Sequence, residues 1–91
     1  MQLESPIRRD TGVPVHKLIR ERVLSAIETG SLVPGDRLPG EPDWADALGV
    51  SRMTLNKAIL SLVRDGWLER VRGSGTFVSN PSSKRRLAIA V

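Results

Sequence analysis

The stretch EPDWADALGVSRMTLNKAILSLVRDG, residues 41 to 66, decides the fold. Its first part predicts a short helix that begins near Glu41, because Pro42 is tolerated in a first turn, where its missing N–H would have no helical partner. The apolar residues that share one face of this helix are Trp44, Ala45 and Leu48. Gly49 ends the helix after about two turns.

A second helix follows at once in this stretch. Ser51 is its candidate N-cap, since a serine hydroxyl accepts a hydrogen bond from an unpaired backbone N–H at the helix start, and Gly66 ends it. The inward stripe consists of Leu55, Ala58, Ile59 and Leu62. The opposite side carries Arg52, Met53, Asn56 and Lys57, with Thr54 at its margin. Two short helices joined by a glycine-containing turn are typical of a helix-turn-helix, whose second helix enters the major groove of DNA.

The outward side of the second helix has the chemistry that reads base pairs. In the major groove, arginine recognises guanine, asparagine recognises adenine, and apolar groups contact the thymine methyl. Arg52, Asn56, Met53 and Thr54 supply these groups, and Lys57 is placed to reach phosphate. For Arg52 or Lys57 taken singly, a solvated helix surface is the alternative interpretation. Asn56 is an indifferent helix former, so its exposed central position needs a reason.

The segment WLERVRGSGTFVS, residues 67 to 79, predicts a β-hairpin. Two runs of alternating character, residues 67–72 and 76–79, flank a Gly-Ser-Gly tip that needs positive φ angles. A narrow glycine tip lets the backbone approach a groove or a phosphate, and two arginines lie on one face of the first strand. The predicted DNA-binding residues here are Arg70, Arg72, Gly73, Ser74, Gly75 and Thr76. An ordinary turn is the alternative.

A further helix precedes this region. The segment PVHKLIRERVLSAIETG, residues 14 to 30, places Val15, Leu18, Ile19, Val23, Ala26 and Ile27 at helical spacing. The connection to Glu41 is rich in proline and glycine, with room for a short extended piece around Arg37 and Leu38. The predicted fold class is therefore mainly α with a small β-hairpin (α+β): three helices followed by a two-stranded wing.

The composition of the chain limits the classes of function that it can have. The chain has 91 residues and a net charge of +4. Residues 1–50 hold six Lys/Arg and eight Asp/Glu, whereas residues 51–91 hold eight and two, so the basic excess begins at Ser51. A localised basic field attracts a polyanion.

With no cysteine, one histidine and no phosphate-binding glycine loop, we expect no enzyme, no cofactor and no metal site. No apolar run approaches the roughly 20 residues of a membrane span, so we expect a soluble, cytoplasmic protein.

Residues 14 to 79 closely resemble the N-terminal winged-helix domain of the GntR family of bacterial transcription regulators. The most specific segments are PGDRLP, LGVSRMT, DGWLERVRGSGTFV and the glutamate at position 41. The segment SRMTLNKAI looks like the histidine-utilisation-repressor branch. The resemblance implies a homodimer on a pseudo-palindromic DNA operator, with the third helix in the major groove and the wing tip toward the minor groove. The family pattern assigns operator contacts to Ser51, Arg52, Thr54, Arg72, Gly73 and Gly75.

The sequence departs from the family pattern at the start of the second helix. The family usually has serine where Gly40 stands and arginine where Pro42 stands, so we expect one phosphate or guanine contact to be missing. Many members also have arginine at the position of Asn56. The operator sequence therefore cannot be transferred from better-known relatives.

The predicted organisation is a flexible tail over residues 1–13, the winged helix-turn-helix over 14–80, and a linker followed by the start of an effector domain over 81–91. The terminal run RRLAIAV resembles the first strand of the sugar-binding sensor of arabinose-repressor-type members; a swapped or added wing strand and a free chain end are the alternatives. In the family, such a domain binds a small-molecule effector and dimerises. Without it, we expect this chain to be monomeric or weakly dimeric.

These observations predict the sequence-specific DNA-binding domain of a metabolite-responsive regulator, a repressor in particular. The alternative is a winged-helix module that binds another protein. The basic excess after Ser51 and the polar outer face of the third helix argue against it.

Overall fold

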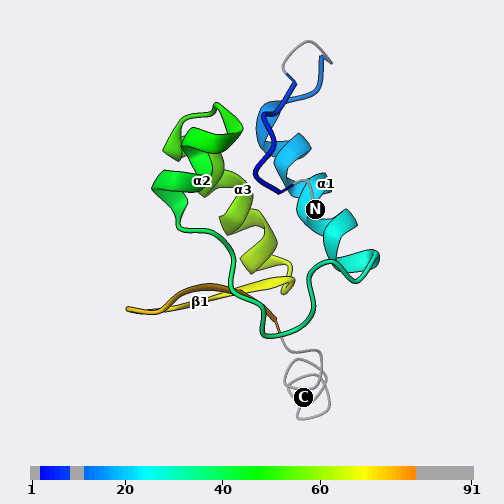
Figure 1. The fold of residues 1–91 in the computed structure, drawn as a ribbon, viewed down its shortest axis with the longest axis vertical. Helices are drawn as coiled ribbons and strands as arrows, with labels where there is room; N and C mark the ends of the chain where they lie inside the picture. Colours follow the sequence, from blue (N-terminus) through cyan, green and yellow to red (C-terminus); the bar gives the residue numbers. More distant parts are fainter. Residues whose placement is uncertain (1–2, 9–11, 80–91) are drawn as a thin grey trace.

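The computed structural model describes residues 3–8 and 12–79. Within these ranges the elements are α1 (Val15–Glu28), α2 (Glu41–Leu48), α3 (Arg52–Arg64), β1 (Leu68–Val71) and β2 (Gly75–Val78). Figure 1 shows the three helices gathered on one side of the antiparallel hairpin of β1 and β2. This architecture is the predicted winged helix-turn-helix. None of the helices in the described part of the chain has both the length and the apolar character to cross a membrane.

Two local signals set the turn between α2 and α3. Gly49 adopts the left-handed conformation with φ +74°, which closes α2. Ser51 is extended, and its Oγ accepts a hydrogen bond from the N–H of Thr54 at 3.1 Å, which confirms the predicted N-cap. Such caps typically stabilise a helix by about 1 kcal/mol. The start of α3 therefore has a defined position relative to α2.

α3 is the centre of the hydrophobic core. Its four predicted inward residues, Leu55, Ala58, Ile59 and Leu62, are all at most 1% exposed. They pack against buried residues of α1 and α2, namely Ile19, Val23, Ala26, Trp44, Ala45 and Leu48. Burial of each large apolar side chain contributes about 1.5–3 kcal/mol. Arg20 of α1 also donates to Ser61 Oγ at 2.5 Å and pairs with Asp65, so α1 holds the far end of α3.

The wing is anchored to the core by its inner face. The register pairs Leu68 with Val78, and both side chains are buried. The segment before α2 pairs with β2 through an isolated bridge at Arg37, where Leu38 N–H donates to the Thr76 carbonyl and Val78 N–H donates to the Asp36 carbonyl, each at 2.8 Å. The predicted extended piece at Arg37 and Leu38 is thus confirmed.

Residues 3–8 differ from the flexible tail that the sequence predicts. Leu3 and Ile7 are buried, at 5% and 9% exposure. The indole N–H of Trp44 donates to the Leu3 carbonyl at 2.7 Å, and the N–H of Ile7 donates to the Leu48 carbonyl at 3.0 Å. Arg22 of α1 donates to the Ser5 carbonyl.

The position of this N-terminal segment explains its burial. Within the described chain, α1 and α2 each pack on α3 and do not pack directly on each other. The segment runs between α1 and the α2–α3 pair in Figure 1 and fills the space there. It therefore acts as a strap that connects α1 to α2. Of the other predicted tail residues, 12–13 are exposed, whereas 1–2 and 9–11 lie outside the described residues, as do the predicted linker and effector-domain start at 81–91.

Candidate nucleic-acid interface

The start of α3 presents most of the predicted DNA-binding residues to solvent. Ser51, Arg52 and Lys57 are exposed, and Met53 is 82% exposed. Thr54 and Asn56 are half-buried at the margin. The high exposure of Met53 leaves its side chain accessible to an external partner.

The hydroxyls at the start of α3 are held by each other. Ser51 Oγ donates to Thr54 Oγ1 at 2.8 Å while it accepts from the Thr54 backbone N–H. The turn before them is closed by the N–H of Val50, which donates to the Ala45 carbonyl at 3.0 Å. Ser51 and Thr54 are thus fixed before any ligand binds, which lowers the entropic cost of a contact at this point.

The tip of the wing also has the predicted form. Residues Arg72, Gly73, Ser74 and Gly75 are exposed. Gly73 and Gly75 have positive φ angles of +80° and +123°, and the N–H of Ser74 donates to the Val71 carbonyl at 2.9 Å. Arg72 lies in this turn, after the end of β1, and not in the strand as predicted. The turn brings its charge to the exposed end of the wing.

Thr76 is the one predicted DNA-binding residue whose side chain is buried. Its side chain is only 7% exposed, because Thr76 and Val78 occupy the inward positions of β2 and the half-buried Phe77 lies between them. Side chains alternate between the two faces of a strand, so the register with β1 turns Thr76 to the core. It has no side-chain surface to offer DNA.

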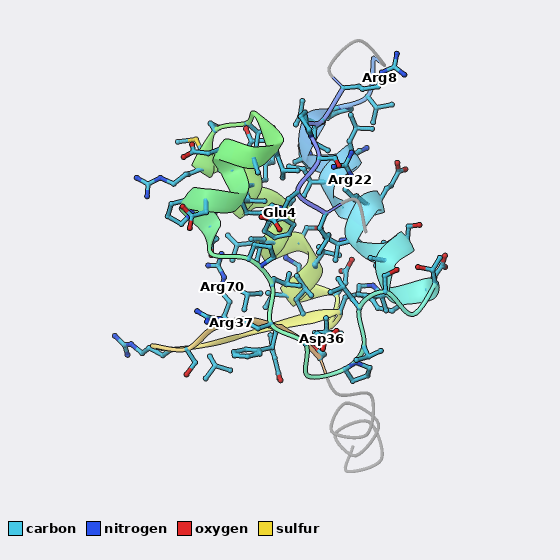
Figure 2. The ribbon with its side chains drawn as sticks, in the orientation of Figure 1. Glu4, Arg8, Arg22, Asp36, Arg37 and Arg70 are labelled. Atoms are coloured by element: carbon cyan, nitrogen blue, oxygen red, sulfur yellow. The ribbon has the colours of Figure 1, made fainter. Side chains whose placement is uncertain are left out.

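Arg70 makes contacts within the protein that the sequence does not indicate. Its Nη2 donates to Glu41 Oε2 of α2 at 2.9 Å and to Asn56 Oδ1 of α3 at 2.6 Å. In Figure 2 the Arg70 side chain extends from the wing toward α2. The interaction joins α2, α3 and β1 at one point. Arg70 was predicted as a cation directed at DNA, but its guanidinium already has two acceptors.

Arg37 is a second residue that sequence reasoning missed as part of this surface. It precedes α2, forms an isolated antiparallel bridge with Phe77, and its guanidinium lies against Gly75. Figure 2 shows it beside the wing. No spacing rule connects residue 37 with residue 75, so only the pairing of its segment with β2 reveals this cation. Arg37 adds positive charge beside the wing.

Comparison with known proteins places these features in a family. The family model for bacterial regulatory proteins of the gntR family matches residues 16–78. The chain is 38% identical over 81 residues to the HTH-type transcriptional repressor NagR of Bacillus subtilis, a match that covers 89% of this chain and 33% of NagR. It is 36% identical over 86 residues to the histidine utilization repressor of Pseudomonas aeruginosa, covering 91% of this chain and 34% of that one. The chain thus spans about a third of the length of these two relatives.

A solved structure with the same fold contains DNA. The crystal structure of AraR(DBD) in complex with operator ORX1 matches with a TM-score of 0.72 and 36% identity, covering 79% of this chain and 87% of that chain. The order of three helices and a wing, the capped start of α3 and the glycine tip agree with the family match over residues 16–78. The chain belongs to the GntR family of bacterial regulatory proteins.

Proposed function

We propose that this chain is the sequence-specific DNA-binding domain of a cytoplasmic bacterial repressor. The observation that carries the proposal is the exposed start of α3, where Arg52, Met53 and Lys57 project from a helix whose other side is fully buried in the core. The similarity to an operator-bound domain at 36% identity supports the same assignment.

In the proposed mode of binding, α3 lies in the major groove, which is about 12 Å wide and accepts one helix. Arg52 then reads a guanine, Met53 and Thr54 contact thymine methyl groups, and Ser51 and Lys57 contact phosphate. The backbone N–H groups at the start of α3 also favour a phosphate, because they carry the positive end of the helix dipole.

The wing has a separate proposed role. Arg72, Gly73, Ser74 and Gly75 approach the minor groove or the flanking phosphates, since a tip with two glycines lets the backbone come close. Arg37 beside Gly75 adds a second positive charge there. Arg70 supports this surface from within the protein.

We further propose that the full-length regulator binds a pseudo-palindromic operator as a homodimer. The relatives are about three times as long as the matched region, which leaves room in them for a further domain. A small-molecule effector bound by such a domain would control binding. This chain by itself is then monomeric or weakly dimeric. A protein-binding role is less favoured, because it leaves the basic charge of α3 and the wing unused.

Selection of bound duplexes from a random DNA pool tests the proposed function. The expected result is a short enriched half-site, with affinity that falls steeply as salt rises, by a log–log slope of about −0.9 for each phosphate neutralised. Lys17→Ala, which removes an exposed charge of α1, is the control and leaves the enriched sequence unchanged. No enrichment of any sequence at low ionic strength would overturn the proposal.

A further inference from the structure

The contact between Arg70 and Asn56 restricts how Asn56 can read a base. Arg70 Nη2 lies 2.6 Å from Asn56 Oδ1 and 2.9 Å from Glu41 Oε2. An arginine side chain has five N–H donors and no acceptor, so only the oxygen of the amide can face it. The Asn56 Nδ2 group, with its two donors, is therefore directed away from Arg70.

Glu41 makes this orientation stable. Its carboxylate holds the Arg70 guanidinium from α2 while Asn56 holds it from α3, and both side chains of the ion pair are only about a third exposed, at 33% and 36%. Hydrogen bonds from a charged donor are shorter and stronger than neutral ones. Rotation of the Asn56 amide would place its Nδ2 against a guanidinium, donor against donor. Arg70 is thus a positioning residue for Asn56.

The orientation of the amide determines which base fits. An asparagine recognises adenine when Oδ1 accepts from N6 and Nδ2 donates to N7. With Oδ1 turned toward Arg70 and one of its two lone pairs engaged there, the Nδ2 donors are the part of the amide left to face the groove. Guanine presents two neighbouring acceptors, N7 and O6, whereas adenine presents its own donor at N6. An amide that presents its Nδ2 donors to the groove therefore favours guanine over adenine.

We propose that Arg70 holds Asn56 so that it reads guanine and discriminates against adenine. This inference rests on the proposed binding of α3 in the major groove. It reverses the adenine preference that the asparagine at this position would otherwise suggest.

The test is selection from randomised half-sites with the parent chain, Asn56→Asp and Arg70→Met, followed by titration of duplexes that differ at one base pair. In the parent, the position that depends on Asn56 is expected to favour guanine over adenine by roughly 5- to 150-fold. Asn56→Asp keeps an acceptor for Arg70 but loses the donors, so the preference is expected to move to the amino-bearing bases, cytosine or adenine. Arg70→Met frees the amide, and the guanine-over-adenine ratio is expected to fall several-fold at this position alone.

Two outcomes distinguish this inference from the proposed function. Asn56→Ala identifies the base-pair position whose preference depends on Asn56. If the parent prefers adenine at that position, the inference is wrong and the proposed function stands. The same holds if Asn56→Ala changes the preference at no position while Arg52→Ala changes the preference at one. If the parent enriches no sequence, both are wrong. Thermal unfolding of each variant provides the folding control. If Arg70→Met does not fold, the comparison of Asn56→Asp and Asn56→Ala with the parent still decides the question.

Discussion

Gly75 lies directly against the guanidinium of Arg37. A Cβ added at Gly75 would come within 3.0 Å of Arg37 Nε and 3.4 Å of Nη2. The two residues are held together because the segment of Arg37 pairs with β2 at Phe77. The positive φ of +123° therefore favours glycine at position 75, and an added Cβ would also require the flexible end of the exposed Arg37 side chain to shift by a few tenths of an ångström.

Alanine variants separate the cost of the positive φ angle from the cost of the contact with Arg37. Gly75→Ala is expected to cost about 2–3 kcal/mol of unfolding free energy, mainly through backbone strain at φ +123°, with a smaller cost for displacing the end of the Arg37 side chain. Gly73→Ala is the matched variant: Gly73 also has positive φ, +80°, but nothing lies within 4 Å of an added Cβ. It is expected to cost about 1–2 kcal/mol. Urea denaturation measures both.

A double variant provides the control. Arg37→Ala in the Gly75→Ala background removes the crowding and leaves the backbone strain, so part of the lost stability is expected to return. If Arg37→Ala recovers nothing, contact with Arg37 does not contribute to the cost at Gly75.

Loss of the α3 cap gives a second prediction. Ser51→Ala removes the acceptor of the 3.1 Å bond from Thr54 N–H and is expected to destabilise the fold by about 0.5–2 kcal/mol. Ser51→Asn is the matched control, since an asparagine side chain also caps a helix. Both are measured by urea denaturation without DNA. An alanine variant as stable as the parent would show that the cap is unimportant to α3.

The strap gives a third prediction. Leu3→Ala removes a side chain that is 5% exposed between α1 and α2, and we expect a loss of about 2–3 kcal/mol, at the lower end of the range for buried leucines because the site is at the edge of the core. Val13→Ala, at a position 39% exposed, is the control and is expected to cost less than about 0.5 kcal/mol. If residues 3–8 were a free tail, the two variants would have equal stability.

Much of the fold followed from local patterns in the sequence. The helical spacing of apolar residues, Ser51 as an N-cap and Gly49 as a helix end depend on neighbours within one or two turns, and the structure confirms each of them. The strap was missed because Leu3 and Ile7 have no period of their own. Their burial depends on the space between α1 and α2, which forms only because both helices pack on α3 and not on each other in the described chain.

The candidate site likewise has a part that local sequence patterns predict and a part that they do not. The exposed start of α3 could be predicted from the helix period alone. The Arg70 contacts could not, since they join residues that are 29 and 14 positions apart. The burial of the Thr76 side chain could not be predicted, because its direction depends on the register of the hairpin, and a shift of one residue reverses every side chain of a strand.

Two basic residues of α3 have different proposed roles that binding measurements can separate. Arg52→Ala is expected to lose about 1–3 kcal/mol of binding free energy and the preference at one base pair, because a bidentate contact to guanine is removed. Lys57→Ala is expected to weaken binding to all sequences alike and to reduce the salt slope by about 0.9, because one phosphate contact is lost. Titration of the selected half-site and of single-base variants at several salt concentrations measures both effects. Lys17→Ala removes the same charge from an exposed position of α1. It is expected to leave the base-pair preference and the salt slope of binding unchanged. If Arg52→Ala binds with the affinity and preference of the parent, Arg52 does not read a base, and α3 lies in the groove in a different orientation or does not enter it.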